Sequence, residues 1–228
     1  RAGLRGPGRA VAGAANMKMP VFSRLTAVIA VIAIVALTAH AQMPEAEPPP
    51  PYAGPVATAI FAGGCFWCME QDFEKLPGVV DVESGYTGGW TENPSYRAVS
   101  SGRTGHTEAI RVIYDPQRIS YPQLVGYFWR HIDPTVKDEQ FCDVGPQYRS
   151  GIYWQNEAER EVAEASREML LRSGRFQNIY TELAPASMFW RAEEFHQDYY
   201  RKNPLRYSYY RAACGRDARV AEVWGERK

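Results

Sequence analysis

Two cysteines, Cys65 and Cys68, enclose a pair of aromatic residues in the stretch 63–70, GGCFWCME. This spacing is typical of a redox pair, a structural disulfide or half of a metal site. The double glycine before Cys65 allows a sharp backbone turn, and we expect a helix to begin at this cysteine. The N–H groups and positive dipole end of a helix favour a thiolate. The sequence therefore predicts a lowered pKa for Cys65 and a nucleophilic role, rather than that of a buried structural thiol.

The chain has two further cysteines, Cys142 and Cys214, which stand alone in the sequence. Structural zinc sites with four thiolates usually show two CxxC pairs, and only one is present here. We therefore expect no metal site.

The elements that must position these cysteines follow from hydrophobic patterning and from Gly and Pro signals. Strands are expected at 58–62, 79–86, 107–114, 150–154 and 179–183, and helices at 65–76, 120–131, 156–173 and 195–202, the last ended by Pro204. Residues 87–105 form a long loop, and long loops in compact domains are usually functional. The element order predicts an α/β fold, a two-layer sandwich of the split βαβ (ferredoxin-like) type with a mixed sheet.

The N-terminal part has the features of an export segment. Residues 17–41 contain a basic start, an apolar run and a small-residue end (Ala39-His40-Ala41), which together are typical of a secretory signal peptide. A membrane anchor is the alternative, but the run is shorter than the roughly 18–20 residues that span a bilayer. We interpret residues 1–16 as read-through upstream of the true start at Met17. A periplasmic or secreted protein without stable membrane association after signal cleavage is expected.

The rest of the chain is divided into three parts. Residues 42–57 are a Pro-rich linker, residues 58–215 the folded domain and residues 216–228 a C-terminal tail. The chain has 26 basic and 26 acidic residues; five basic residues and no acidic ones lie in 1–41, which leaves 21 basic side chains against 26 acidic ones. No basic stripe remains, so we expect no nucleic-acid partner.

Five segments, taken together and in this order, resemble the A-type peptide methionine sulfoxide reductases. They are GGCFWCME, GYTGG, NPSYRAVSSGRTGHTEAI, DVGPQYRSGIY and AEEFHQDYYRKNP, between about Thr58 and Cys214. The resemblance implies an α/β sandwich, no cofactor, and thiol-dependent reduction of the S epimer of methionine sulfoxide, free or in proteins. It implies a role in protein repair after oxidation.

The same resemblance assigns the site residues. Cys65 matches the nucleophile, which becomes a sulfenic acid, and Glu108 matches the acid. A sulfoxide is a poor electrophile until its oxygen is protonated, so Glu108 must stay neutral near pH 7, and burial can raise its pKa enough. Substrate-binding positions are Phe66, Trp67, Tyr96, Asp143 and Tyr148. We expect His106 and His196 to serve as structural hydrogen-bond partners.

A sulfenic acid at Cys65 must condense with a second thiol. Cys68 is one helical turn away, whereas Cys214 would need a mobile tail. We expect Cys68 to resolve the sulfenic acid and Cys214 to pass the disulfide to a thioredoxin-like reductant. No role is predicted for Cys142, which lies near the pocket if Asp143 does.

Two other functions fit parts of the sequence. One is a thiol–disulfide oxidoreductase that uses CFWC, although no Ile/Thr-Pro loop of the thioredoxin type is present. The other is a secreted binding domain held by disulfides, which would contain two stable bridges and would not lose its function on thiol alkylation.

Overall fold

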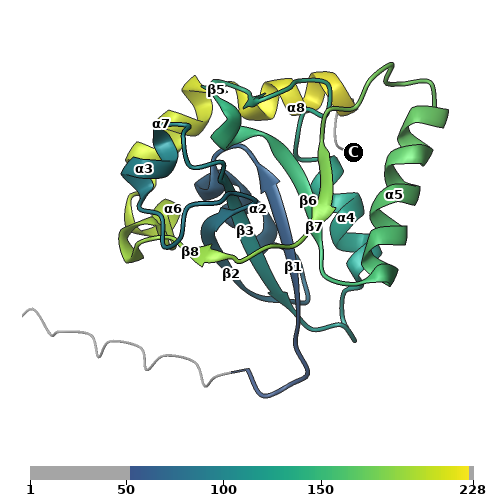
Figure 1. Ribbon diagram of the computed structural model, residues 1–228, viewed down its shortest axis with the longest axis horizontal. Coiled ribbons are helices and arrows are strands. Elements are labelled where there is room, and N and C mark those ends of the chain that lie inside the picture. The colour runs from purple at the N-terminus through teal and green to yellow at the C-terminus, as the bar shows by residue number, and fades with distance from the viewer. Residues whose placement is uncertain (1–51, 226–228) are drawn as a thin grey trace, which may run out of the picture. The chain divides into compact units, whose positions relative to one another are not determined.

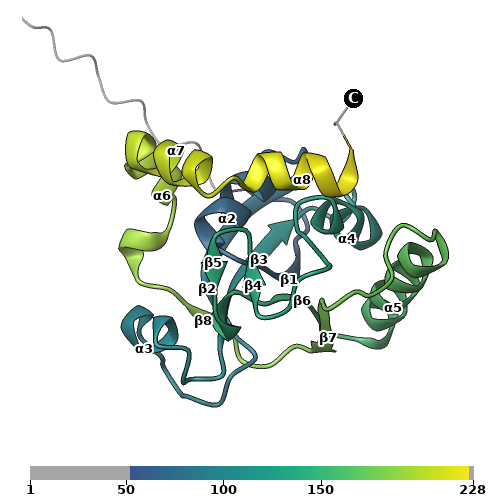
Figure 2. The same ribbon diagram turned by 90° about the horizontal axis from the view of Figure 1, so that it is seen from above.

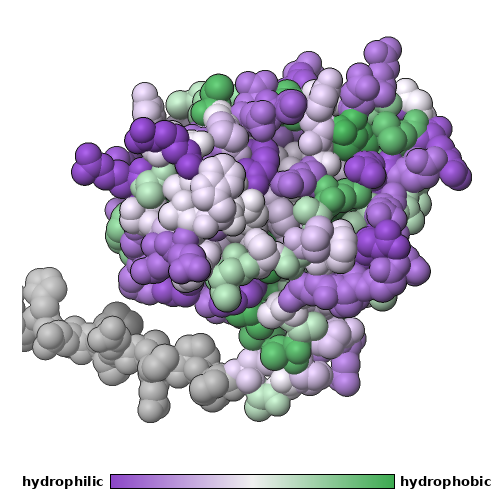
Figure 3. Space-filling view, in the orientation of Figure 1, coloured by the Kyte–Doolittle hydropathy of each residue, from purple (hydrophilic) through white to green (hydrophobic). Residues whose placement is uncertain are grey.

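The computed structural model describes residues 52–225. The predicted read-through (1–16), the predicted signal peptide (17–41) and residues 42–51 of the predicted linker lie outside the described residues. Within residues 52–225, no helix has the length and apolar character needed to cross a membrane. On the face shown in Figure 3, hydrophilic residues predominate and hydrophobic ones form small separate patches.

A mixed sheet of six strands is the centre of the fold (Figure 1). Its strands, in spatial order, are β7 (Glu182–Pro185), β6 (Ser150–Trp154), β1 (Ala57–Gly63), β3 (Thr107–Tyr114), β2 (Val79–Thr87) and β8 (Trp190–Arg191). All neighbours are antiparallel except β6 and β7, which are parallel. The predicted α/β class and mixed sheet are confirmed.

Two helices cover one face of this sheet. Phe61 of β1 stacks on Phe73 of α2 (Phe66–Glu74) at 5.3 Å and on Phe128 of α4 (Tyr121–Trp129) at 5.2 Å, measured between ring centroids. A third helix, α5 (Glu157–Arg172), lies beside α4, as both ribbon views show (Figures 1 and 2). It is joined to α4 by a hydrogen bond from the Trp129 indole to Ser166.

The opposite face of the sheet is covered by an extended segment rather than by a helix. Side chains from three strands form a small cluster there: Ile60, Ala62, Ala109 and Tyr153. Ala184 of β7 packs against it, as do Ala186 and Phe189 of the connection between β7 and β8.

The region between residues 87 and 107 contains a short helix, α3 (Tyr96–Ser100), that the sequence analysis placed inside a loop. Ser95 caps it by accepting a hydrogen bond from the Ala98 N–H. Five residues of helix carry too little periodic signal to be recognised in the sequence. Short elements also connect β3 to β6: β4 (Glu139–Gln140), β5 (Asp143–Val144) and the 3-10 turn η1 (Pro146–Tyr148).

The C-terminal part differs most from expectation. After η2 (Glu194–His196), α6 (Tyr199–Lys202) ends at Lys202 as predicted, but Pro204 then begins a further helix, α7 (Pro204–Ala213), that was not predicted. Proline is favoured at a first helical position because its missing N–H has no partner there anyway. The region predicted as a tail forms α8 (Arg216–Trp224) as far as Trp224, and α7 and α8 run end to end along one side of the sheet (Figures 1 and 2). The ordered chain therefore continues past the predicted boundary at Gly215.

Candidate active site

The turn between β1 and α2 places Cys65 at the start of the helix, as the sequence predicts. Cys65 is the N-cap residue of α2, and its carbonyl accepts hydrogen bonds from the N–H groups of Cys68 (3.1 Å) and Met69 (3.3 Å). Gly64 has φ +80°, which favours glycine. A Cβ at Gly63 would lie 2.5 Å from the Met69 sulfur. Both glycines are needed to bring the helix start against the sheet.

Cys65 and Cys68 are free thiols that are hydrogen-bonded to each other, and both are buried, with exposed fractions of 5% and 1%. Burial raises the pKa of Cys65 well above its ordinary value, and Cys68, Glu108 and Asp143 add to this rise. The prediction of a lowered pKa for Cys65 is therefore wrong. The loss of hydration on burial raises this pKa by more than the helix dipole lowers it.

The pKa of Cys68 is instead lowered to about 7, first by the hydrogen bond from Cys65 and then by the positive charges of Arg216 and Arg211. The two thiols can thus share one negative charge near neutral pH. Reactivity at the helix start belongs to this pair rather than to Cys65 alone.

Glu108 lies on β3 directly beside the helix start. One of its carboxylate oxygens accepts a hydrogen bond from the Phe66 backbone N–H at 3.0 Å, and its side chain is 3% exposed. Burial raises its pKa to about 8, although the Phe66 N–H acts in the opposite direction. The raised pKa of Glu108 agrees with the prediction, and it keeps the carboxyl group protonated at neutral pH.

Aromatic rings form one wall of the site. The Phe66 ring is 6.3 Å from the Tyr96 ring and 6.2 Å from the Trp67 ring, between centroids. Trp67 stacks on Tyr199 at 3.7 Å, and its indole N–H donates to His196 Nδ1 at 3.1 Å. The orientation of Trp67 is therefore fixed on two sides.

Both histidines have structural partners, as expected. His196 accepts from Trp67, and burial lowers its pKa to about 4, so that it stays neutral. His106 accepts from the Gly89 N–H through Nδ1, and its Nε2 lies 2.7 Å from the Thr91 carbonyl oxygen. The pair thus holds the loop that carries Tyr96 and the ring of Trp67.

The reactive groups and the aromatic wall line one cavity of about 70 Å³. Its lining residues are Cys65, Phe66, Trp67, Tyr96, Glu108, Asp143, Tyr148 and Tyr210. The predicted nucleophile, the predicted acid and all five predicted substrate-binding residues thus come together from β1–α2, α3, β3, β5 and η1. Cys68 lies directly behind Cys65, while Cys214 does not line the cavity.

Tyr210 is the one lining residue that sequence reasoning missed. Its hydroxyl donates to Asp143 at 2.6 Å and is also hydrogen-bonded to Cys65. It comes from α7, four residues before Cys214. That i, i+4 spacing was a usable signal, but adjacent tyrosines in the same segment gave no means of choosing among them.

Cys214 forms a disulfide with Cys142, 72 residues away in sequence. Cys142 is exposed and stands next to Asp143, whereas Cys214 is half-buried at the end of α7. The donor atoms of Cys142, Asp143 and Cys214 lie within 4.8 Å of one another. A disulfide has no thiolate to offer a metal ion, so in this oxidised form the cluster is not a metal site.

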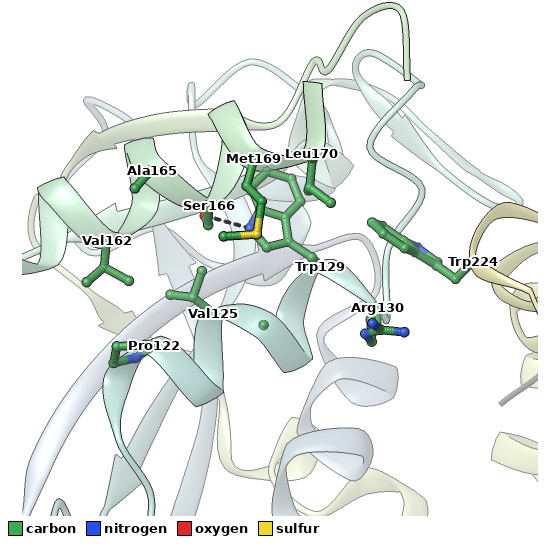
Figure 4. A pocket seen from close by; sticks show the side chains of 11 residues that line it. Pro122, Val125, Trp129, Arg130, Val162, Ala165, Ser166, Met169, Leu170 and Trp224 are labelled. Carbon is green, nitrogen blue, oxygen red and sulfur yellow. Dashed lines mark hydrogen bonds between the residues drawn. The ribbon is translucent and has the colours of Figure 1, made fainter. Parts of the chain in front are cut away.

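An apolar cavity of about 400 Å³ lies elsewhere, between α4, α5 and the end of α8 (Figure 4). Val125, Trp129, Met169 and Trp224 line it, and Arg130 is its one charged residue. It contains no thiol or carboxyl group near enough to do chemistry. The reactive groups are all at the smaller cavity.

Comparison with known proteins agrees with the site. The family model described as peptide methionine sulfoxide reductase matches residues 57–228. A peptide methionine sulfoxide reductase from Caulobacter vibrioides is 50% identical over 168 residues, 74% of this chain and 85% of that protein. One from Halalkalibacterium halodurans is 48% identical over 169 residues, 74% and 96% of the two chains. The structure of methionine sulfoxide reductase A of Corynebacterium diphtheriae matches with a TM-score of 0.60 at 38% identity, over 66% of this chain and 76% of that chain.

Proposed function

The chain belongs to the peptide methionine sulfoxide reductase family, and we propose that the cavity over Cys65 binds the oxidised end of a methionine side chain. The protein reduces methionine sulfoxide at the expense of thiols. The observation that carries the assignment of the site is the buried Glu108, neutral at pH 7 and bonded to the residue next to Cys65. A neutral acid at this place can protonate a sulfoxide oxygen.

The reaction follows from the positions of the side chains. The S-methyl group contacts the apolar faces of Phe66 and Trp67, while the sulfoxide oxygen lies toward Glu108, Tyr96 and Tyr148. Glu108 gives its proton to the oxygen. The Cys65 sulfur attacks the activated substrate, the oxygen passes to Cys65, and methionine leaves. The proton lost by the Cys65 thiol replaces the one that Glu108 donated.

The product on the enzyme is a sulfenic acid at Cys65. Cys68 condenses with it, so that a Cys65–Cys68 disulfide forms and water leaves. Cys68 is suited to this step because it already holds a hydrogen bond to Cys65 and has a pKa of about 7. Cys214, the other predicted resolving residue, is bonded to Cys142 in this structure, and a thioredoxin-like dithiol is the expected final reductant.

The function is tested with the two epimers of methionine sulfoxide in the presence of dithiothreitol. We expect turnover of the S epimer only, and none after Cys65→Ser. Equal turnover of both epimers, or activity that survives Cys65→Ser, would refute the assignment. The alternative of a thiol–disulfide oxidoreductase is not favoured, because a protein disulfide cannot reach two thiols with exposed fractions of 5% and 1%.

Two further expectations stay proposals. A periplasmic or secreted location is supported by the signal-like pattern in residues 17–41, and fractionation of cells that express the full chain would test it. The split βαβ (ferredoxin-like) classification as a two-layer sandwich is supported by the strand order β6-β1-β3-β2 with antiparallel neighbours. A fold comparison restricted to these four strands and helices α2 and α4 would test that classification.

A further inference from the structure

The apolar cavity between α4, α5 and the end of α8 lies away from the reacting groups (Figure 4). Its volume of about 400 Å³ is well above the 70 Å³ of the active-site cavity. Pockets of roughly 300–1,000 Å³ with apolar walls and a few polar groups are the usual sites for small ligands. The proposed reaction does not use this cavity, so its own lining must show what it can hold.

The polar atoms of three lining side chains are already used within the protein. The Trp129 indole N–H donates to the Ser166 hydroxyl at 2.8 Å, and this hydroxyl donates to the Ala163 carbonyl oxygen at 2.7 Å. The Trp224 indole N–H donates to the Ile132 carbonyl oxygen at 2.8 Å. The two indole rings are therefore fixed, and what they present to a ligand is apolar surface.

Gly126 keeps the cavity open on the side of α4. It lies inside this helix, where glycine is less stable than alanine. Leaving aside its own helix, no atom lies within 4 Å of a Cβ placed on it. Close packing therefore does not require a glycine here, and a larger side chain would fill space that is now empty.

One positive charge stands at an end of the cavity. Arg130 is the C-cap residue of α4, lines the cavity and is exposed. Within the described part of the chain its guanidinium forms no ion pair or hydrogen bond, and no acidic residue lines the cavity. Figure 4 shows Arg130 near Trp224 and away from Pro122 and Val162. A second cation, Arg175, lies 5.9 Å from the Trp224 ring centroid, so this end of the cavity is positive.

We propose that this cavity binds the anion of a medium-chain fatty acid, with the carboxylate on Arg130 and the tail along α4 toward Pro122. The inference goes beyond the proposed reaction and does not depend on it. A free guanidinium favours a carboxylate, because its N–H groups match the two carboxylate oxygens. Apolar walls favour a tail without polar groups.

The size of the cavity limits the length of the tail. From Pro122 to Arg130 the helix rises by roughly 12 Å. A cavity of about 150 Å³ holds one benzene ring, so about 400 Å³ has room for roughly ten to fifteen carbon atoms. Met169, which is 70% exposed at the same cavity, has a flexible side chain that can close over a bound tail. Decanoate fits these limits and is the probe for the tests.

The head group is tested by calorimetric titration of the full chain near neutral pH, with three probes of equal tail length below their micelle-forming concentrations. Decanoate should bind saturably, decanol more weakly and decyltrimethylammonium most weakly. Arg130→Gln should lower the affinity for decanoate at least about tenfold, the value of a charge-assisted hydrogen bond, and leave that for decanol unchanged. Arg118→Gln, at an exposed arginine outside the cavity, should change neither. Equal affinity for the three probes, or no effect of Arg130→Gln, would overturn the proposal.

The location is tested by filling the cavity. Gly126→Leu should abolish binding of both decanoate and decanol, and the thermal unfolding transition should not fall, because leucine is the better helix former. A decanoate analogue with a photoreactive tail should label α4 or α5 of the wild type, which locates the site even if the variant does not fold. Labelling confined to other elements, or binding that survives in folded Gly126→Leu, would contradict the assignment.

Two other occupants would give different results. A second copy of the chain on this face would give a dimer in sedimentation that Gly126→Leu dissociates, and no saturable binding of decanoate. The apolar run at 25–38 of the same chain, if it filled the cavity, would leave a monomer that binds no decanoate. Either result would overturn the proposal.

Discussion

Glu108 accepts the backbone N–H of Phe66 at 3.0 Å, so the proposed acid is tied to the first turn of the helix that begins at Cys65. The bond fixes one carboxylate oxygen and leaves the other for the cavity. It also couples the two halves of the reaction, because any movement of the helix start displaces the acid and the nucleophile together. A general acid and a nucleophile that are fixed to each other need little rearrangement when substrate binds.

Replacing Glu108 by Gln should lower turnover at neutral pH by roughly 10²–10⁴-fold, the usual contribution of a general acid. The amide keeps the size of the carboxyl group and can still accept from Phe66, so the helix start should hold. Alkylation of Cys65 by iodoacetamide at the wild-type rate would show that the site is intact. Turnover close to that of the wild type would remove Glu108 from the acid role.

The pH dependence of turnover should follow the same carboxyl group. Its pKa is about 8, so the acid form is present below this pH and is lost as the pH rises through it. We expect kcat to fall above about pH 8 in the wild type, and Glu108→Gln to lack that fall at its lower rate. A wild-type profile that stays flat to pH 10 would contradict the raised pKa.

Stability should decrease with pH because a second carboxyl, Glu70, is also buried, with 1% exposed, and has a pKa raised by burial to about 8. Its pKa in the folded state lies above the ordinary 4.5, so the folded chain binds more protons and loses stability as the pH rises from about 4.5 to about 8. Glu70→Gln should flatten this decline in the free energy of unfolding, measured with urea at pH 5 and pH 8. Glu164→Gln, on the exposed side of α5, is the matched control.

Replacing Trp67 by Ala should cost roughly 1–3 kcal/mol in kcat/KM, the value of a methyl-sized contact in an apolar pocket. The stacking contact with Tyr199 and the hydrogen bond to His196 are lost as well. The thermal unfolding transition must therefore be measured together with the kinetics. Trp67→Phe retains an aromatic wall and loses only the indole N–H. If Trp67→Ala unfolds the domain while Trp67→Phe is fully active, Trp67 is a packing residue.

The resolving cysteine is tested by mass mapping after one equivalent of substrate, with all thiols reduced beforehand and no reductant present. We expect a Cys65–Cys68 bridge both in the wild type and in Cys214→Ser. The reason is that Cys68 is already in contact with the sulfenic acid, one helical turn away. A Cys65–Cys214 bridge in the wild type, together with persistent sulfenic acid in Cys214→Ser, would assign resolution to Cys214 instead.

Local patterns were sufficient to predict the central elements and the place of Cys65 at a helix start. The double glycine before Cys65 and the alternation in residues 107–114 determine a strand, a turn and a helix by short-range effects alone. The resemblance then selected Glu108, Tyr96 and Tyr148. The structure places them, with Cys65, around one cavity.

What the sequence could not provide depends on tertiary contacts. The pKa of Cys65 is decided by competition between a helix terminus and burial, and burial cannot be predicted from the eight-residue motif at 63–70. Tyr210 enters the cavity only because α7 lies across the β4–β5 hairpin. Pro204 was taken only as the end of a helix, whereas it also begins the next one, α7, because proline suits the first turn of a helix.

Arg216 completes the turn that carries the reactive cysteine. It is 2% exposed, donates to the carbonyl oxygens of Gly63 and His131, and lies over the Phe141 ring. This arginine is synthesised after every residue that lines the cavity. A chain that ends at Tyr210 would therefore contain every residue that lines the cavity. It would still lack Arg216, which donates hydrogen bonds to the turn before Cys65. The turn that carries Cys65 therefore gains these hydrogen bonds only when α8 docks.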